Sequence, residues 1–364
     1  MSNFDPNAIL RGAQLTLVGA HRALQNPSLF KYEHFRQAAI AVCAGIAIRM
    51  IVAFPILLIK VVIWMLSWVS DLEYATWDDK LVHSLDFLSS SVLQLPFLLM
   101  TLTRYITPTL DDMFMESLKW VDTTYVQKHK SENTENLRAM YYPNMVMYQK
   151  KSSMQVGDIA QGLLVFLKRY GRRTAMSLAV YLLSMLPIVG RFVLPAASFY
   201  TFNKAVGPVP AVAIFGSGLF LPKRVLVLFL QSYFSSRSLM RELLEPYFSR
   251  IQFNKEQKRR WFLDREGVLF GFAFGFYFIL RTPLLGVLLY GVAEASTAYL
   301  LTKITDPPPP PAYSEGFAES QVAWKNKHEF LKLPLGSMDL HNVDLYAADE
   351  KPKEKRELPQ KKFS

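Results

Sequence analysis

The sequence has few residues for covalent, redox or metal chemistry. Cys43 is its only cysteine, so no disulfide can form within the chain, and it lies in an apolar stretch, where we expect a small buried hydrophobic side chain. Its six histidines do not occur at the spacing of metal ligands, and the chain contains no HExxH, GxSxG, P-loop or GxGxxG motif. We therefore predict that the protein is not an enzyme and uses no cofactor or metal.

A cleavable signal peptide is also missing, whereas long apolar blocks are prominent. Of the 364 residues, 51% are hydrophobic. They concentrate in four blocks, at residues 38–69, 85–106, 174–234 and 267–302. A helix of a soluble domain shows one apolar stripe, but these blocks are apolar nearly all round, as membrane helices are. Because residues 1–37 are polar and mixed, we expect the first block to act as an uncleaved insertion signal.

The excess positive charge lies at the edges of the apolar blocks. The net charge is +11, and basic residues flank the blocks at Arg36, at 168–173 and at 258–265. The positive-inside rule and attraction to anionic headgroups explain this placement without nucleic acid, so we predict membrane lipids as the partner. The acidic segment 71–80 faces away from the cytosol, which places both termini in the cytosol.

Block lengths and prolines together predict the architecture. We expect an all-α, polytopic membrane protein with proline-kinked transmembrane helices and partly penetrating helical hairpins, because Pro55, Pro187 and Pro195 interrupt blocks of awkward length. Residues 1–37 form an amphipathic segment that lies in the membrane interface or packs on the rest of the protein. Residues 38–305 form the membrane domain, which includes a cytosolic loop at 107–173 and surface helices at 237–266. Residues 306–364 form a Pro-rich, largely disordered tail.

The block 267–302 is too long for one ordinary span and slightly short for two. A helical hairpin that bends between Arg281 and Gly286 fits its length, since Pro283 disfavours a straight helix. Arg281 then lies near the tip, where it either reaches the far interface or faces a polar interior with Glu294 as its partner. Gly271 and Gly275 form a GxxxG pair, which allows two helices to approach closely and points to a possible homo-oligomer.

Three stretches carry a resemblance to a known family. They are LLSMLPIVGRFVLPAASFY (182–200), RRWFLDREG (259–267) and GFAFGFYFILRTPLLGVLLYGVAEASTAYLL (271–301). Their order resembles the CysZ-like and etoposide-induced membrane-protein superfamily, and in particular its fungal branch of UsgS-type transmembrane proteins, which are related to outer-spore-wall and lipid-droplet proteins. The resemblance covers residues 8–305. It implies an all-α membrane fold, a location in endoplasmic-reticulum or lipid-droplet membranes, and a link to sporulation through spore-wall formation.

Three functions are compatible with these features. The first is a non-enzymatic integral membrane protein that organises lipid surfaces. The second is an anion transporter or channel, since the superfamily includes sulfate-uptake proteins, with Arg281 and Arg191 guiding the ion. The third is a membrane adaptor whose tail binds a WW domain, because Pro310, Pro311 and Tyr313 form a PPxY motif within a run of prolines.

Overall fold

The computed structural model describes the protein in five main segments, residues 5–30, 109–129, 137–149, 223–280 and 285–333. It also describes residues 341–342 and 361–362, and single positions between 36 and 65 and between 168 and 212. This part of the chain is all-α, as predicted, apart from a two-residue antiparallel pairing of β1 (His341–Asn342) with β2 (Lys361–Lys362). The second apolar block lies outside the described residues, and so does the third up to Pro222 except at single positions.

The described elements are almost all helices. In chain order, the elements are α1 (Pro6–Leu24), η1 (Pro27–Phe30), α5 (Thr109–Lys128), α6 (Tyr142–Met147), α10 (Lys223–Leu243), α11 (Glu245–Arg250), α12 (Lys255–Asp264), α13 (Glu266–Leu280), α14 (Leu285–Ile304), η5 (Pro311–Tyr313), α15 (Phe317–Ser320) and α16 (Lys327–Lys332). Asp5 caps α1 by accepting a hydrogen bond from the Asn7 amide, and Asn254 and Gln257 form a capping box at the start of α12.

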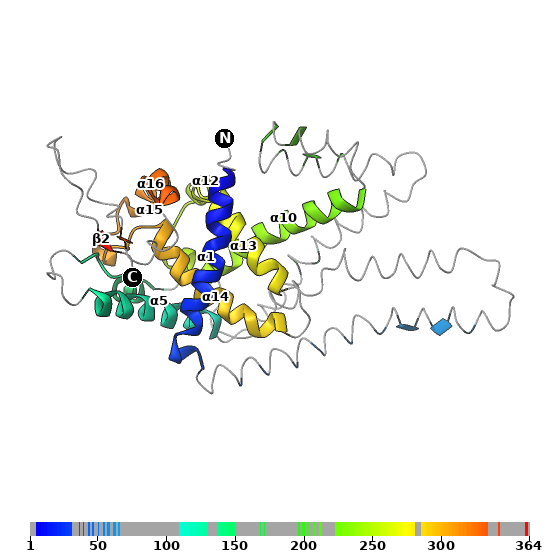
Figure 1. Cartoon of the computed structure of the whole chain (residues 1–364), viewed down its shortest axis with the longest axis horizontal. Helices are drawn as coiled ribbons and strands as arrows, with labels where there is room; N and C mark the ends of the chain where they lie inside the picture. The colour runs from blue at the N-terminus through cyan, green and yellow to red at the C-terminus, as the bar shows by residue number, and fades with distance from the viewer. Residues whose placement is uncertain are drawn as a thin grey trace.

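Helices α13 and α14 form the hairpin at the centre of the bundle. Helix α13 ends at Leu280 and α14 begins at Leu285, on either side of the bend that the sequence predicts. The two ends of the hairpin meet, because Arg265 Nε donates a hydrogen bond to the Ile304 carbonyl at 2.8 Å. The predicted pairing of two helices is therefore confirmed, whereas their entry into a membrane stays a prediction. Figure 1 shows α13 in yellow and α14 in gold.

The 15 residues of α13 correspond to a length of about 22 Å, less than the roughly 30 Å of a hydrocarbon core. Among the residues that the structure describes, no helix has both the length and the apolar character needed to cross a membrane.

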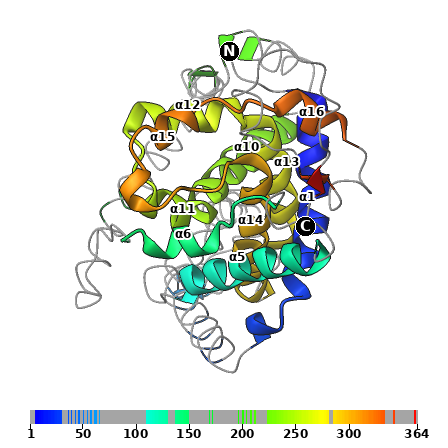
Figure 2. The same cartoon turned by 90° about the vertical axis from the view of Figure 1, so that its left-hand side faces the viewer.

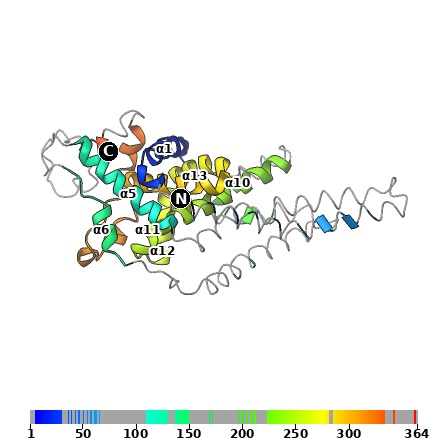
Figure 3. The ribbon, with the colours of Figure 1, turned by 90° about the horizontal axis from the view of Figure 1, so that it is seen from below.

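Three other helices surround the hairpin. Helix α1 lies along both α13 and α14, α5 packs on α14, and α10 packs on α13. Figure 2 shows α14 with α5 below it, α10 and α13 above it, and α1 at one side. Of the labelled helices, α10 extends furthest from the bundle (Figure 3). The core lies where these helices meet and includes Phe114, Leu243, Phe272 and Tyr299.

Helix α5 corrects one expectation. The sequence predicts a cytosolic loop at 107–173, but residues 109–128 form a helix of 20 residues. Its inner face consists of Phe114, Leu118, Val121 and Tyr125, each at most 4% exposed. Their spacing of three or four residues places them on one side of the helix, toward α14.

The segment 237–266 is helical, as predicted, but its apolar stripe is part of the core. Leu239, Leu243 and Tyr247 are fully buried, and Phe248 and Ile251 are buried beside them. The basic residues 258–260 lie on its surface side. Arg259 and Arg260 are exposed, Arg260 pairs with Glu256, and Lys258 lies 4.3 Å above the Phe248 ring.

The C-terminal segment, defined as residues 306–333, also differs from expectation. The sequence predicts that it is part of a largely disordered tail, but Phe317, Trp324 and Phe330 are buried. The segment crosses the junction between α12 and α13, where the Trp324 amide donates to Asp264 at 2.6 Å. It then reaches α1, where Arg11 donates to the carbonyls of Leu331 and Leu333. Aromatic residues at 317, 324 and 330 therefore supply the apolar area that a disordered tail lacks.

Candidate functional site

Large apolar side chains are exposed at helical positions in the first apolar block. All eight such positions that the structure describes there are 43–69% exposed. They are Ile46, Met50, Phe54, Leu57, Leu58, Val61, Val62 and Met65. Cys43 is exposed as well, so the prediction of a buried cysteine is wrong.

Helix α1 meets α13 through small residues on both helices. We call Gly12, Thr16 and Gly19 of α1, with Gly271 and Gly275 of α13, the glycine seam. A methyl group on Gly271 would overlap the Ile9 carbonyl, and one on Gly12 would overlap the Val268 carbonyl, so the two backbones touch. Thr16 Oγ1 also donates to the Phe272 carbonyl at 3.0 Å across the seam.

The glycine seam settles two points that the sequence leaves open. The pair Gly271 and Gly275 does mediate close helix–helix contact, but its partner is α1 of the same chain. Helix α1 in turn packs on the rest of the protein, with Gly12, Leu15, Thr16 and Gly19 buried. The sequence does not reveal this contact, because nothing local in residues 6–24 indicates which helix they face and α13 lies far away along the chain.

The two candidate arginines are not placed. Arg281 and Arg191 lie outside the described residues. Glu294, the proposed partner of Arg281, is fully buried in α14. The role of these residues in guiding an ion therefore stays a prediction.

The PPxY residues are at the surface of the C-terminal segment. Pro310 and Pro311 are exposed, and the Tyr313 side chain is 78% exposed. The motif ends in the turn η5, in which the Tyr313 amide donates to the Pro310 carbonyl at 2.8 Å. The preceding prolines are anchored on α6, because Asn144 Nδ2 donates to the Pro308 carbonyl and Tyr148 Oη donates to the Pro309 carbonyl, both at 2.7 Å.

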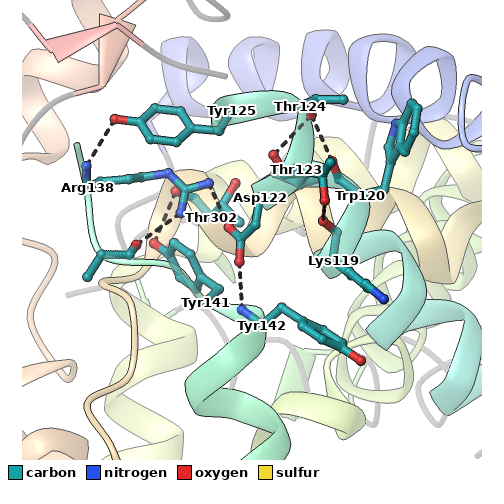
Figure 4. A network of polar contacts seen from close by, with 12 residues as sticks. Lys119, Trp120, Asp122, Thr123, Thr124, Tyr125, Arg138, Tyr141, Tyr142 and Thr302 are labelled. Atoms are coloured by element: carbon teal, nitrogen blue, oxygen red, sulfur yellow. Dashed lines mark hydrogen bonds and ion pairs between the residues drawn. The ribbon is translucent and has the colours of Figure 1, made fainter. Parts of the chain in front are cut away.

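A buried polar network joins α5 to the residues before α6 (Figure 4). Asp122 accepts hydrogen bonds from Arg138 Nη2 at 2.9 Å and from the Tyr142 amide at 2.7 Å. The Arg138 guanidinium lies over the rings of Tyr125 and Tyr141, 4.5 and 5.0 Å from their centres. Burial raises the pKa of Asp122, and the charge of Arg138 opposes this shift.

The same network reaches α14. Tyr141 Oη donates to the carbonyls of Thr302 and Thr305 near the end of that helix. These contacts satisfy buried polar groups of three segments at once, so we interpret the network as structural.

A second buried polar group lies at the start of α13. Glu266 Oε1 accepts hydrogen bonds from Tyr233 Oη at 2.9 Å and from Arg237 Nη1 at 3.1 Å. The carboxylate is 7% exposed and adjoins a cavity of about 20 Å³, roughly the size of one water molecule, lined also by Met240 and Phe262. Burial raises the pKa of Glu266, while Arg237 acts in the opposite direction.

This raised pKa predicts how stability changes with pH. The folded chain takes up a proton on Glu266 above pH 4.3, the approximate pKa of an unfolded-state glutamate. The free energy of unfolding should therefore rise as pH falls from the raised pKa toward about 4.3. Glu266→Gln should lose this dependence, which chemical unfolding at two pH values would measure. The exposed Glu319→Gln variant is the control, and equal pH profiles for all three proteins would contradict the assignment.

The chemical groups in the described part offer no metal centre. No three His, Cys, Asp or Glu side chains come together there in a way that could hold a metal ion. Comparison of the chain with family models, with curated proteins and with solved structures found no match. The family resemblance of the three stretches therefore stays a prediction.

Proposed function

We propose that the protein is a non-enzymatic integral membrane protein that organises the lipid surface of endoplasmic-reticulum or lipid-droplet membranes. The exposure of the eight large apolar side chains described between Ile46 and Met65 is the observation that carries this proposal. Complete burial of one such side chain stabilises a protein by about 1.5–3 kcal/mol. Eight of them in contact with water therefore expose a large apolar area at an unfavourable free energy. Acyl chains remove that area from water without any change in the helix.

The more specific parts of the proposal have separate support. The endoplasmic-reticulum or lipid-droplet location and the link to spore-wall formation rest on the family resemblance. The cytosolic placement of both termini rests on the basic flanks of the apolar blocks and on the acidic segment 71–80. The anion-transporter alternative depends on Arg281 and Arg191, and no described contact favours it.

Extraction of the full chain from membranes tests the proposal. We expect tagged protein to stay in the membrane fraction after treatment with alkaline carbonate, and to colocalise with endoplasmic reticulum or lipid droplets. Replacement of Phe54 and Leu57 by glutamate should reduce this fraction, because charge in the hydrocarbon region is costly. Matched glutamate substitutions at the exposed polar residues Gln25 and Ser320 should leave it unchanged. Release of the unaltered chain by carbonate would refute the proposal.

The exposed tyrosine of the PPxY motif favours a second function, a membrane adaptor for a WW-domain protein such as a ubiquitin ligase. WW grooves bind an extended polyproline helix, and Pro310 has the matching backbone angles, with φ −55° and ψ 150°. Binding also requires the turn η5 to open, since its hydrogen bond closes the motif at Tyr313.

The adaptor function predicts a specific loss of binding. Tyr313→Ala should weaken binding of a purified WW domain at least tenfold, as measured by titration calorimetry, because the exposed ring is the side chain that the domain would bury. Glu315→Ala, which is exposed in the same turn region, is the matched control. Equal affinity for the three proteins would exclude the motif as the binding site.

A further inference from the structure

Three of the four leucines of helix α1 lie on its outer face, and Leu15 is buried. Leu10, Leu17 and Leu24 are 60%, 72% and 51% exposed. The side that faces the protein consists mainly of small residues, among them Ala8, Gly12, Thr16, Gly19 and Ala23. The three leucines are seven residues apart, so they form one stripe along the outer face.

This arrangement is the reverse of what water favours. A surface helix in water buries its leucines in the core and exposes polar residues. In lipid, acyl chains are as apolar as leucine, so leucines gain nothing from facing the protein, and helices pack instead through small residues and interhelical hydrogen bonds. The glycine seam and the hydrogen bond from Thr16 to the Phe272 carbonyl are contacts of the second kind.

The apolar surface continues beyond α1. Helix α13 runs in the same direction as α1, since residues 9–13 lie against 268–272 and Thr16 lies against Gly275. Phe278 and Ile279, which follow Gly275 by one turn, are 55% and 39% exposed. Phe30, shortly after α1, is 51% exposed. The outer stripe of α1 is thus followed at its C-terminal end by further exposed apolar side chains.

We propose that the outer stripe of α1 contacts the acyl chains of a lipid bilayer or monolayer, with the helix lying along the membrane surface. The inference rests on the proposed membrane function and adds the element that makes this contact. The stripe extends from Leu10 to Leu24, about 21 Å along the helix axis, so the whole length of the helix is in contact and it lies flat. The glycine seam holds the opposite face of α1 against α13, so the leucine stripe stays turned away from the protein.

Cysteine substitution can test the contact, since Cys43 is the only cysteine to remove. In a Cys43→Ser background, Leu10, Leu17 and Leu24 are replaced one at a time by cysteine and labelled with an environment-sensitive fluorophore. Asn7 and Gln25, which are exposed polar residues at the two ends of the same helix, are the matched controls. The full chain is reconstituted into vesicles of dioleoylphosphatidylcholine.

We expect labels at the three leucine positions to be quenched several-fold more by a lipid-borne quencher than labels at Asn7 and Gln25, which a water-borne quencher should reach. Phe54→Cys serves as a reference for the first apolar block. Lipid quenching at Phe54 with water quenching at Leu17 would overturn this inference and leave the proposed function intact. Water quenching at both positions would overturn the two together.

Discussion

Replacement of Gly271 by leucine is expected to detach α1 from α13 and to destabilise the protein severely. Even a methyl group on Gly271 would overlap the Ile9 carbonyl, and it would lie 3.0 Å from the Ala13 amide. Both obstacles are backbone atoms of a continuous helix, so no side-chain rotation can relieve the overlap. We expect a loss of about 3 kcal/mol or more in the free energy of unfolding, at the upper end of overpacking effects.

A graded series of alanine substitutions separates this cause from a general intolerance of the helix. Gly271→Ala and Gly12→Ala should be severe, because each meets backbone. Gly275→Ala should be intermediate, because its nearest neighbour, at 2.7 Å, is the Thr16 side chain, which can rotate. Gly19→Ala should be mild, since its nearest atom lies at 3.2 Å. Chemical unfolding in detergent would measure the order, and equal effects at all four sites would contradict the observed packing.

The glycine seam also shows what the sequence can predict. The spacing of Gly271 and Gly275 correctly indicated a close helix contact. The partner could not be identified, because Gly12 and Thr16 lie more than 250 residues away in the sequence. The hairpin was predictable for the opposite reason. Its bend depends on Pro283 and on the length of a single apolar block, which are local properties of the chain.

Helix α5 and the C-terminal segment were missed for a related reason. Both have a polar average composition, which predicts an exposed loop for the first and a disordered tail for the second. Their burial depends on a few apolar residues at the right intervals, such as Phe114 and Leu118 in α5 and Phe317 and Trp324 after α14. The helical spacing of Phe114 and Leu118 is a periodic signal that indicates a buried face. The aromatic residues Phe317 and Trp324 have no regular spacing, so they give no such signal.

Arg265, between α12 and α13, is a charged residue that is almost completely buried. Its side chain is 1% exposed, with Nε donating to the Ile304 carbonyl and the guanidinium 4.6 Å above the Trp261 ring. Burial lowers its pKa to about 10, so it remains charged at neutral pH. Its Nη1 also donates to the Val322 carbonyl at 3.3 Å, which connects the open end of the hairpin, opposite the bend, to the C-terminal segment. A basic residue that the sequence assigned to a headgroup-facing flank is therefore part of the core.

Asp111 of α5 forms a largely buried ion pair with Arg250 of α11. Arg250 Nη1 donates to Asp111 Oδ1 at 2.8 Å and Nη2 donates to Oδ2 at 2.7 Å, a two-pronged contact between α11 and α5. The two side chains are 9% and 13% exposed, so water screens the pair only weakly. Arg250 Nη1 also donates to the Pro246 carbonyl at 2.9 Å, which fixes the guanidinium on its own helix.

Arg250→Met should therefore destabilise the protein by about 3–5 kcal/mol, because it removes the guanidinium while the Asp111 carboxylate stays buried. The double variant Asp111→Leu with Arg250→Met should recover most of the loss, since two apolar side chains of similar size replace the pair. Arg260→Met, which breaks the exposed pair with Glu256, should cost about 0.5 kcal/mol or less, because both of its side chains are more than half exposed and water screens them. A double-mutant cycle by chemical unfolding measures these differences. If the single and double variants lost equal stability, the cost would come from packing around Arg250 and not from the buried carboxylate.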